Sequence, residues 1–161
     1  MLDTGLMPFA SIAEVEALVH QFENCELPTS LWNHQAHLAV GAWYVSTMPE
    51  ADATEQMIHG IRRYNHANGV YTSPTGGYHE TITLFWLVVA RETLVALMEK
   101  YDLLQRINLF IENFSGRQDI LWSFYDRDRL FSADARAHWV PPHKWPGGRL
   151  GPLSSALRGR P

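Results

Sequence analysis

The stretch that decides the fold is YHETITLFWLVVA, residues 78–90. Its last seven residues, 84–90, are all apolar, and a mixed apolar and charged pattern continues through residues 91–100. A buried strand could use so short an apolar run, but the total length favours a helix. A helix that is apolar nearly all round lies among other helices rather than on a surface. We therefore predict a buried helix over residues 79–100.

Other segments of the chain also have helical patterns. Ser11 and Glu14 are spaced as a capping box, in which a hydroxyl and a carboxylate satisfy backbone amides of the first turn. Pro49 ends the helix before it, because helical geometry is disfavoured in the residue that precedes a proline. The predicted segments are residues 11–25, 31–48, 52 or 54 to 68, 103–114 and 119–126, with a brief turn over residues 132–137.

These segments predict an all-α protein, most simply an antiparallel bundle of about five to six helices. A chain of 161 residues is long enough for one domain with its own core. We place this single helical domain at residues 1–142. Proline, glycine, serine and arginine dominate residues 143–161, which predicts an irregular or disordered tail.

The composition excludes several classes of protein. Apolar residues make up 46% and charged residues 19%, as in globular rather than disordered chains. A net charge of -4 argues against nucleic acid as the main partner. The longest apolar run is far shorter than a membrane span. The single Cys25 fits a reducing compartment, and residues 1–6 lack the pattern of a signal peptide, so we predict a cytoplasmic protein.

Two histidines lie at the predicted start of the second helix. His34 and His37 are three residues apart, so their side chains share one helix face. A metal ion needs converging lone pairs, and two imidazoles at this spacing supply two of them. The structural alternative is that Asn33, His34 and His37 cap and line the helix start through bonds to backbone and water.

A third histidine and a carboxylate open the central helix. Next to Phe85 and Trp86, His79 and Glu80 need partners, because burial of unpaired polar groups is costly. Adjacent helical residues point about 100° apart, so we predict one ligand and one neighbour with a separate task. His79 is then the third metal ligand, and Glu80 acts as the general base, orients a ligand from outside the shell, or completes the shell. In the structural alternative, Glu80 satisfies first-turn amides and His79 faces solvent.

Further residues are candidates for binding a substrate. Arg62, late in the third helix, would hold an anionic group, although arginine there also complements the helix dipole. Tyr64 and Asn65 follow it in the chain, and Tyr78 and Trp86 would line a pocket beside the histidines. We predict these five as substrate-binding residues.

Several motifs of known chemistry do not occur. The chain has no dinucleotide-binding glycine fingerprint, Walker loop, nucleophile elbow or C-x-x-C pair. It also lacks the paired E-x-x-H motifs of ferritin-like di-iron bundles and the H-E-x-x-H motif of zinc proteases.

Four stretches carry a resemblance to other proteins: WNHQAHL (32–38), GIRRYN (60–65), GYHETIT (77–83) and ARAHWVPP (135–142). The chain resembles a group of small bacterial proteins of unknown function that share an aromatic-x-H-x-x-H-L start, a Y-H-E-T-I-T segment and an ending of this kind. The resemblance covers roughly residues 30 to 142. It implies that the two histidine-bearing helix starts belong to one family pattern, and it names no reaction.

Three functions are consistent with this pattern. The first is a metal-dependent protein, in its plainest form a hydrolase of a small substrate, in which His34, His37 and His79 hold zinc, iron, manganese or nickel. The second is a non-catalytic module that binds a small molecule in a pocket lined by histidine, arginine and aromatic side chains. The third is an interaction protein whose helices pair in a homodimer.

Overall fold

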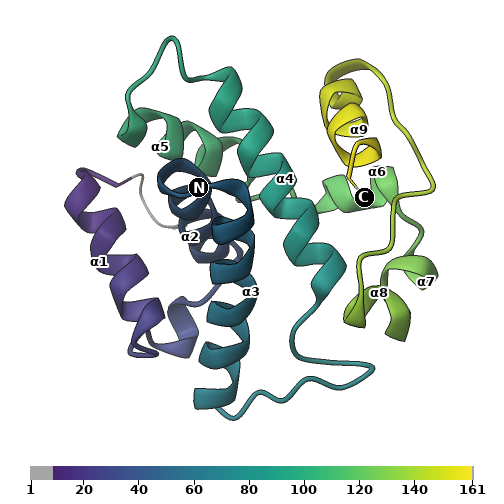
Figure 1. The fold of residues 1–161 in the computed structure, drawn as a ribbon, viewed down its shortest axis with the longest axis horizontal. Helices are drawn as coiled ribbons and strands as arrows, with labels where there is room; N and C mark the ends of the chain where they lie inside the picture. Colours follow the sequence, from purple (N-terminus) through teal and green to yellow (C-terminus); the bar gives the residue numbers. More distant parts are fainter. Residues whose placement is uncertain (1–8, 161) are drawn as a thin grey trace, which may run out of the picture.

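The computed structural model describes residues 9–160, and these form an all-α protein (Figure 1). The all-α prediction is confirmed over this range, whereas the antiparallel order of a simple bundle stays a prediction. The helices are α1 (Ile12–Glu23), α2 (His34–Thr47), α3 (Glu50–Ala67), α4 (Glu80–Ala96), α5 (Leu103–Phe114), α6 (Leu121–Phe124), α7 (Arg127–Leu130), α8 (Ala133–Ala137) and α9 (Gly151–Arg158). Short 3-10 turns form at η1 (Thr29–Leu31), η2 (Gln118–Ile120) and η3 (Gly148–Leu150).

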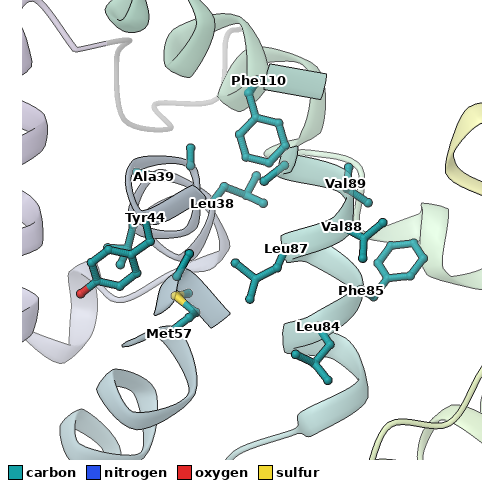
Figure 2. Packing of buried hydrophobic residues seen from close by; sticks show 14 of the residues in the cluster. Leu38, Ala39, Tyr44, Met57, Leu84, Phe85, Leu87, Val88, Val89 and Phe110 are labelled. Atoms are coloured by element: carbon teal, nitrogen blue, oxygen red, sulfur yellow. The ribbon is translucent and has the colours of Figure 1, made fainter. Parts of the chain in front are cut away.

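Helix α4 lies between two groups of helices. In Figure 1, helices α1, α2, α3 and α5 are on one side of it and the C-terminal helices α6 to α9 are on the other. Leu87 points toward α2, while Phe85 faces away from it (Figure 2) and packs 5.3 Å from Phe124 of α6, centroid to centroid. Both faces of α4 are therefore buried, as its all-round apolar sequence predicts.

Polar side chains define the helix starts. The Ser11 side chain accepts a hydrogen bond from the Glu14 amide, so the predicted cap by Ser11 is confirmed, whereas the Glu14 carboxylate accepts from the Ala10 amide and does not complete a capping box. Asn33 caps α2 in the same way through the Ala36 amide. Helix α3 begins at Glu50, before the predicted Asp52, directly after Pro49. Pro49 thus separates α2 from α3 with a very short connection.

The region after α5 is more broken than expected. In place of the helix predicted over residues 119–126, the structure has the 3-10 turn η2 followed by the four-residue helix α6. Helix α6 ends at Phe124 because Tyr125 has extended backbone, with φ -132° and ψ 145°. The buried Tyr125 donates its hydroxyl hydrogen to the Val140 carbonyl at 2.8 Å. Two further short helices, α7 and α8, follow. Ser132 caps α8, which matches the turn predicted over residues 132–137.

The prediction of an irregular tail after Pro142 is corrected by helix α9. Leu150, Leu153 and Leu157 are spaced so that they share one helix face, and this face packs against α4. Pro152 is tolerated because it lies in the first turn, where a missing amide hydrogen costs little. Ser154 donates to the Pro146 carbonyl at 2.6 Å, which anchors the helix to the segment before it.

Two expectations concern membranes and export. Over residues 9–160, no helix is long and apolar enough to cross a membrane. Residues 1–6, on which the expectation of no signal peptide depends, lie outside the described part of the chain.

Gly60 of α3 provides a test of this packing. A Cβ atom at Gly60 would lie 2.8 Å from Cε1 and 2.9 Å from Cζ of Phe22. Phe22 is fully buried and stacks on Trp32 at 4.4 Å, so its ring has little room to move. We expect Gly60→Ala to lower the free energy of unfolding by about 1–3 kcal/mol, measured by denaturant titration.

Gly41 of α2 is the matched control. A Cβ atom there would meet Leu87 Cδ2 at 3.5 Å, an ordinary contact. Gly41→Ala should leave the protein as stable or more stable, because alanine is the better helix former by up to about 1 kcal/mol. Equal stability of the two variants would contradict the packing around Phe22.

Candidate functional site

A cavity of about 590 Å³ lies among helices α2, α3, α4 and α5 and the segment that contains η2 and α6. Leu38, Met57, Leu87 and Phe110 come from four different helices and supply part of its apolar wall (Figure 2). The other lining residues are Trp32, Asn33, His34, His37, Gly41, Ile61, Asn65, Gly77, Tyr78, His79, Ile82, Thr83, Trp86, Ala90, Gln118, Asp119, Leu121, Trp122 and Phe131. All three histidines of the predicted metal site therefore line the cavity.

His34 is the first residue of α2. Its Nε2 lies 3.3 Å from the Phe114 carbonyl oxygen, and because a carbonyl only accepts, Nε2 carries the hydrogen. The ring meets Trp86 edge to face, with centroids 4.7 Å apart. Burial lowers the pKa of His34, while the Phe114 carbonyl opposes this effect. The neutral ring therefore keeps Nδ1 as a hydrogen-bond acceptor.

His37 lies one helical turn further along. Its Nδ1 donates to the Asn33 carbonyl at 2.7 Å, which leaves Nε2 as the acceptor. The imidazole stacks on Trp32 with centroids 3.7 Å apart. Burial lowers the pKa of His37 from 6.5 to about 4, against the opposing effect of the Asn33 carbonyl, so the ring is neutral at pH 7. These carbonyl bonds, with the Asn33 cap, match the structural alternative for the start of α2.

Both ring nitrogens of His79 are hydrogen-bonded to the backbone. It is the N-cap of α4: Nδ1 accepts from the Ile82 amide at 3.3 Å, and Nε2 donates to the Leu130 carbonyl at 2.8 Å. The side chain is buried, at 8% exposure, so the alternative in which it faces solvent is wrong. Both ring nitrogens are engaged by backbone atoms. A metal could bind His79 only after one of these bonds broke.

Glu80 forms a group with Tyr78 and Arg62. The Tyr78 hydroxyl donates to Glu80 Oε2 at 2.6 Å, and Arg62 Nη2 lies 3.8 Å from the same oxygen. The Arg62 guanidinium also covers the Tyr78 ring at 4.6 Å. Burial, together with the bond to Glu80, raises the pKa of Tyr78. Tyr78 lines the cavity, but Glu80 and Arg62 do not, so the predicted general base has no contact with the cavity.

The remaining predicted substrate residues divide in the same way. Asn65 and Trp86 line the cavity. Tyr64 does not: it is buried beside Trp32 and donates its hydroxyl hydrogen to the Leu27 carbonyl at 2.7 Å. Its contacts are those of a core residue.

Four residues at the cavity mouth were not predicted. Gln118, Asp119, Trp122 and Phe131 line the cavity and are exposed. Trp122 and Phe131 lie 5.8 Å apart, and Arg127 covers both rings, at 5.7 Å and 5.3 Å. The helix predicted over residues 119–126 contains Asp119 and Trp122, but nothing in its pattern indicates that these side chains line a cavity formed by α2, α3, α4 and α5. Trp122 is 38% exposed and Phe131 is 42% exposed. This exposure of large aromatic side chains indicates a binding site, but it can be recognised only in the folded structure.

The C-terminal segment holds the start of α4 in place. Thr81 is fully buried; its hydroxyl donates to the His138 carbonyl at 2.8 Å and accepts from the Val140 amide at 3.0 Å. Arg136 Nη1 donates to the carbonyls of Gly77 and Tyr78 at 3.1 Å and 3.4 Å. The YHETIT and ARAHWVPP stretches are therefore in direct contact.

The predicted metal site lacks a third ligand in this arrangement. Within residues 9–160, no group of three or more histidine, cysteine, aspartate or glutamate side chains is placed to hold a metal ion. His34 and His37 each keep one acceptor nitrogen, whereas His79 keeps none. The metal prediction therefore stays a prediction.

Comparison with known protein families, curated proteins and solved structures finds no match for the chain.

Replacement of His79 tests its role as a cap. We expect His79→Ala to lower the free energy of unfolding by about 1–3 kcal/mol, because both the cap and the bond to Leu130 are lost. His79→Asn should be intermediate, since asparagine is a good N-cap but cannot reproduce the Leu130 bond in the same geometry. Thermal and denaturant unfolding measure the order. A chelator that destabilised the unmodified protein would instead support a metal at His79.

The pKa of His37 predicts a pH dependence of stability. Between pH 6.5 and about 4 the unfolded chain protonates His37 and the folded chain does not, so unfolding takes up a proton. Stability should therefore fall as the pH decreases through this window, by roughly 3 kcal/mol from this residue. Denaturant titrations at several pH values measure this effect. The free energy of unfolding should fall more steeply with decreasing pH for the unmodified protein than for His37→Gln. Parallel curves would contradict the lowered pKa.

Proposed function

We propose that the protein binds a small, largely apolar molecule in the cavity among α2, α3, α4 and α5. A single observation carries this proposal: a cavity of about 590 Å³ with aromatic and aliphatic walls and a few polar groups. Small-molecule sites typically have volumes of about 300–1,000 Å³ and this combination of walls and polar groups. The volume suits a molecule with one or two rings.

The surroundings of the cavity favour binding over catalysis. Glu80, the predicted general base, bonds Tyr78 and lies near Arg62, away from the cavity lining. Both ring nitrogens of His79 are bonded to backbone atoms, so His79 has no free position for proton transfer. The polar groups that remain are suited to orienting a ligand by hydrogen bonds.

The cytoplasmic location and the homodimer stay predictions.

A metal-dependent hydrolase is a second candidate, and one observation favours it. His34 and His37 share a helix face and each keeps an acceptor nitrogen, as two ligands of one ion would. Metal analysis of protein purified without a histidine tag, compared with His37→Ala, tests it. Stoichiometric zinc, iron, manganese or nickel in the unmodified protein alone would support this candidate.

A cavity-filling variant tests the binding proposal. Gly41 lines the cavity in α2, and a leucine side chain there would occupy part of its volume. We expect neutral aromatic fragments to change the tryptophan fluorescence of the unmodified protein, because Trp32, Trp86 and Trp122 line the cavity. Gly41→Leu should abolish this response.

Ala67→Leu, at an exposed position of α3, is the matched control and should bind as the unmodified protein does. Circular dichroism establishes that both variants fold. Changes in backbone amide NMR chemical shifts when a fragment is added to the unmodified protein provide a measurement that needs no variant. Shift changes spread over the surface, or equal binding by a folded Gly41→Leu, would contradict the proposal.

A further inference from the structure

Two of the three histidines that line the cavity keep an acceptor nitrogen rather than a donor. The carbonyls of Phe114 and Asn33 take the hydrogens of His34 and His37, so His34 Nδ1 and His37 Nε2 remain as lone pairs. Two hydroxyls that line the cavity have already donated their hydrogens, whereas the amide groups of Asn33, Asn65 and Gln118 still carry donors. Tyr78 donates to Glu80, and Thr83 donates to the His79 carbonyl at 2.9 Å, which leaves the Thr83 hydroxyl oxygen as another acceptor.

The charges around the cavity point in the same direction. Among residues 9–160, no lysine or arginine lines the cavity, and one carboxylate, Asp119, does. Asp119 is paired at its mouth with Arg117, at 2.9 Å and 3.3 Å. An anionic ligand would therefore lose its hydration without gaining a cationic partner. The site favours a neutral ligand.

The two acceptor histidines are both in contact with tryptophan rings. The ring of His37 stacks on Trp32, and the ring of His34 meets Trp86 edge to face. Each acceptor nitrogen is therefore part of a ring that touches a tryptophan of the cavity wall. A flat ligand can use both features at once, with its faces against the aromatic side chains and its edge on an imidazole nitrogen.

We propose that the ligand is a neutral aromatic molecule that donates a hydrogen bond from its edge to His34 Nδ1 or His37 Nε2, as phenols and indoles do. This inference rests on the proposed binding function and specifies its ligand class. A ligand without a donor leaves a buried acceptor unpaired, and sites built to hydrogen-bond a group discriminate against analogues that lack it. The penalty corresponds to a loss of affinity of roughly fivefold to 100-fold.

Matched ligand pairs test the inference. Phenol is compared with anisole, and indole with N-methylindole, because methylation removes the donor and keeps the ring. Benzoate serves as the anionic comparator. We expect titrations followed by tryptophan fluorescence or NMR to give at least about fivefold weaker binding for each methylated partner, and weaker binding for benzoate than for phenol. His37→Phe keeps a ring against Trp32 and should reduce the preference for phenol over anisole. His59→Phe, an exposed position of α3, should not change it.

Imidazole nitrogen NMR gives a measurement on the unmodified protein. Phenol should shift the unprotonated nitrogens of His34 or His37 and leave the bonded nitrogens of His79 nearly unchanged. If anisole binds as tightly as phenol, the donor inference is overturned while the cavity-binding proposal stands. If no member of the panel binds, both are overturned. Zinc that competes with phenol and shifts the same two nitrogens would overturn the inference in favour of the metal site.

Discussion

The burial of the apolar first half of α4 on both sides is the constraint on which the rest of the structure depends. A helical segment that is apolar nearly all round leaves no face suited to water, so other elements must cover it. Helices α2, α3 and α5 cover one side, and α8 and α9 cover the other. The C-terminal residues are therefore part of the core. Leu153 and Leu157 of α9 are buried as completely as most residues of the first helices.

The contacts at the start of α4 connect its burial to the cavity. Arg136 is buried at 9% exposure and bonds the carbonyls of Gly77 and Tyr78. A buried cation is costly without partners, and here these carbonyls are its hydrogen-bond partners, one of them at a long 3.4 Å. The arginine therefore holds the backbone that leads into His79. Through this positional role the ARAHWVPP stretch is joined to the YHETIT stretch in the folded chain.

Much of the fold could be predicted from local patterns, because helix caps and apolar runs act over a few residues. Ser11, Pro49 and the run of residues 84–90 each marked an element that the structure contains. Helix α9 was missed, because its eight residues are rich in residues typical of loops and its apolar face is short. Its stability comes from packing on α4, which a local pattern does not contain.

The site was predicted only in part for a related reason. The i,i+3 spacing of His34 and His37 placed both on one helix face, and both line the cavity. His37 bonds the Asn33 carbonyl four residues away, but the other two rings depend on distant partners: the Phe114 carbonyl is 80 residues from His34 and the Leu130 carbonyl is 51 residues from His79. No spacing rule reports such bonds. These bonds leave His34 with Nδ1 as its acceptor and occupy the second nitrogen of His79, whose first nitrogen caps α4.

The bond from His79 to Leu130 also couples two parts of the protein thermodynamically. Leu130 precedes Phe131, which lines the mouth of the cavity, while His79 caps the first turn of α4. Local opening of the segment around Phe131 would remove the Leu130 carbonyl from His79. Fraying of the first turn of α4 would break the same bond from the other side. A ligand of the kind proposed that ordered the mouth would, through this bond, also favour order in the first turn of α4.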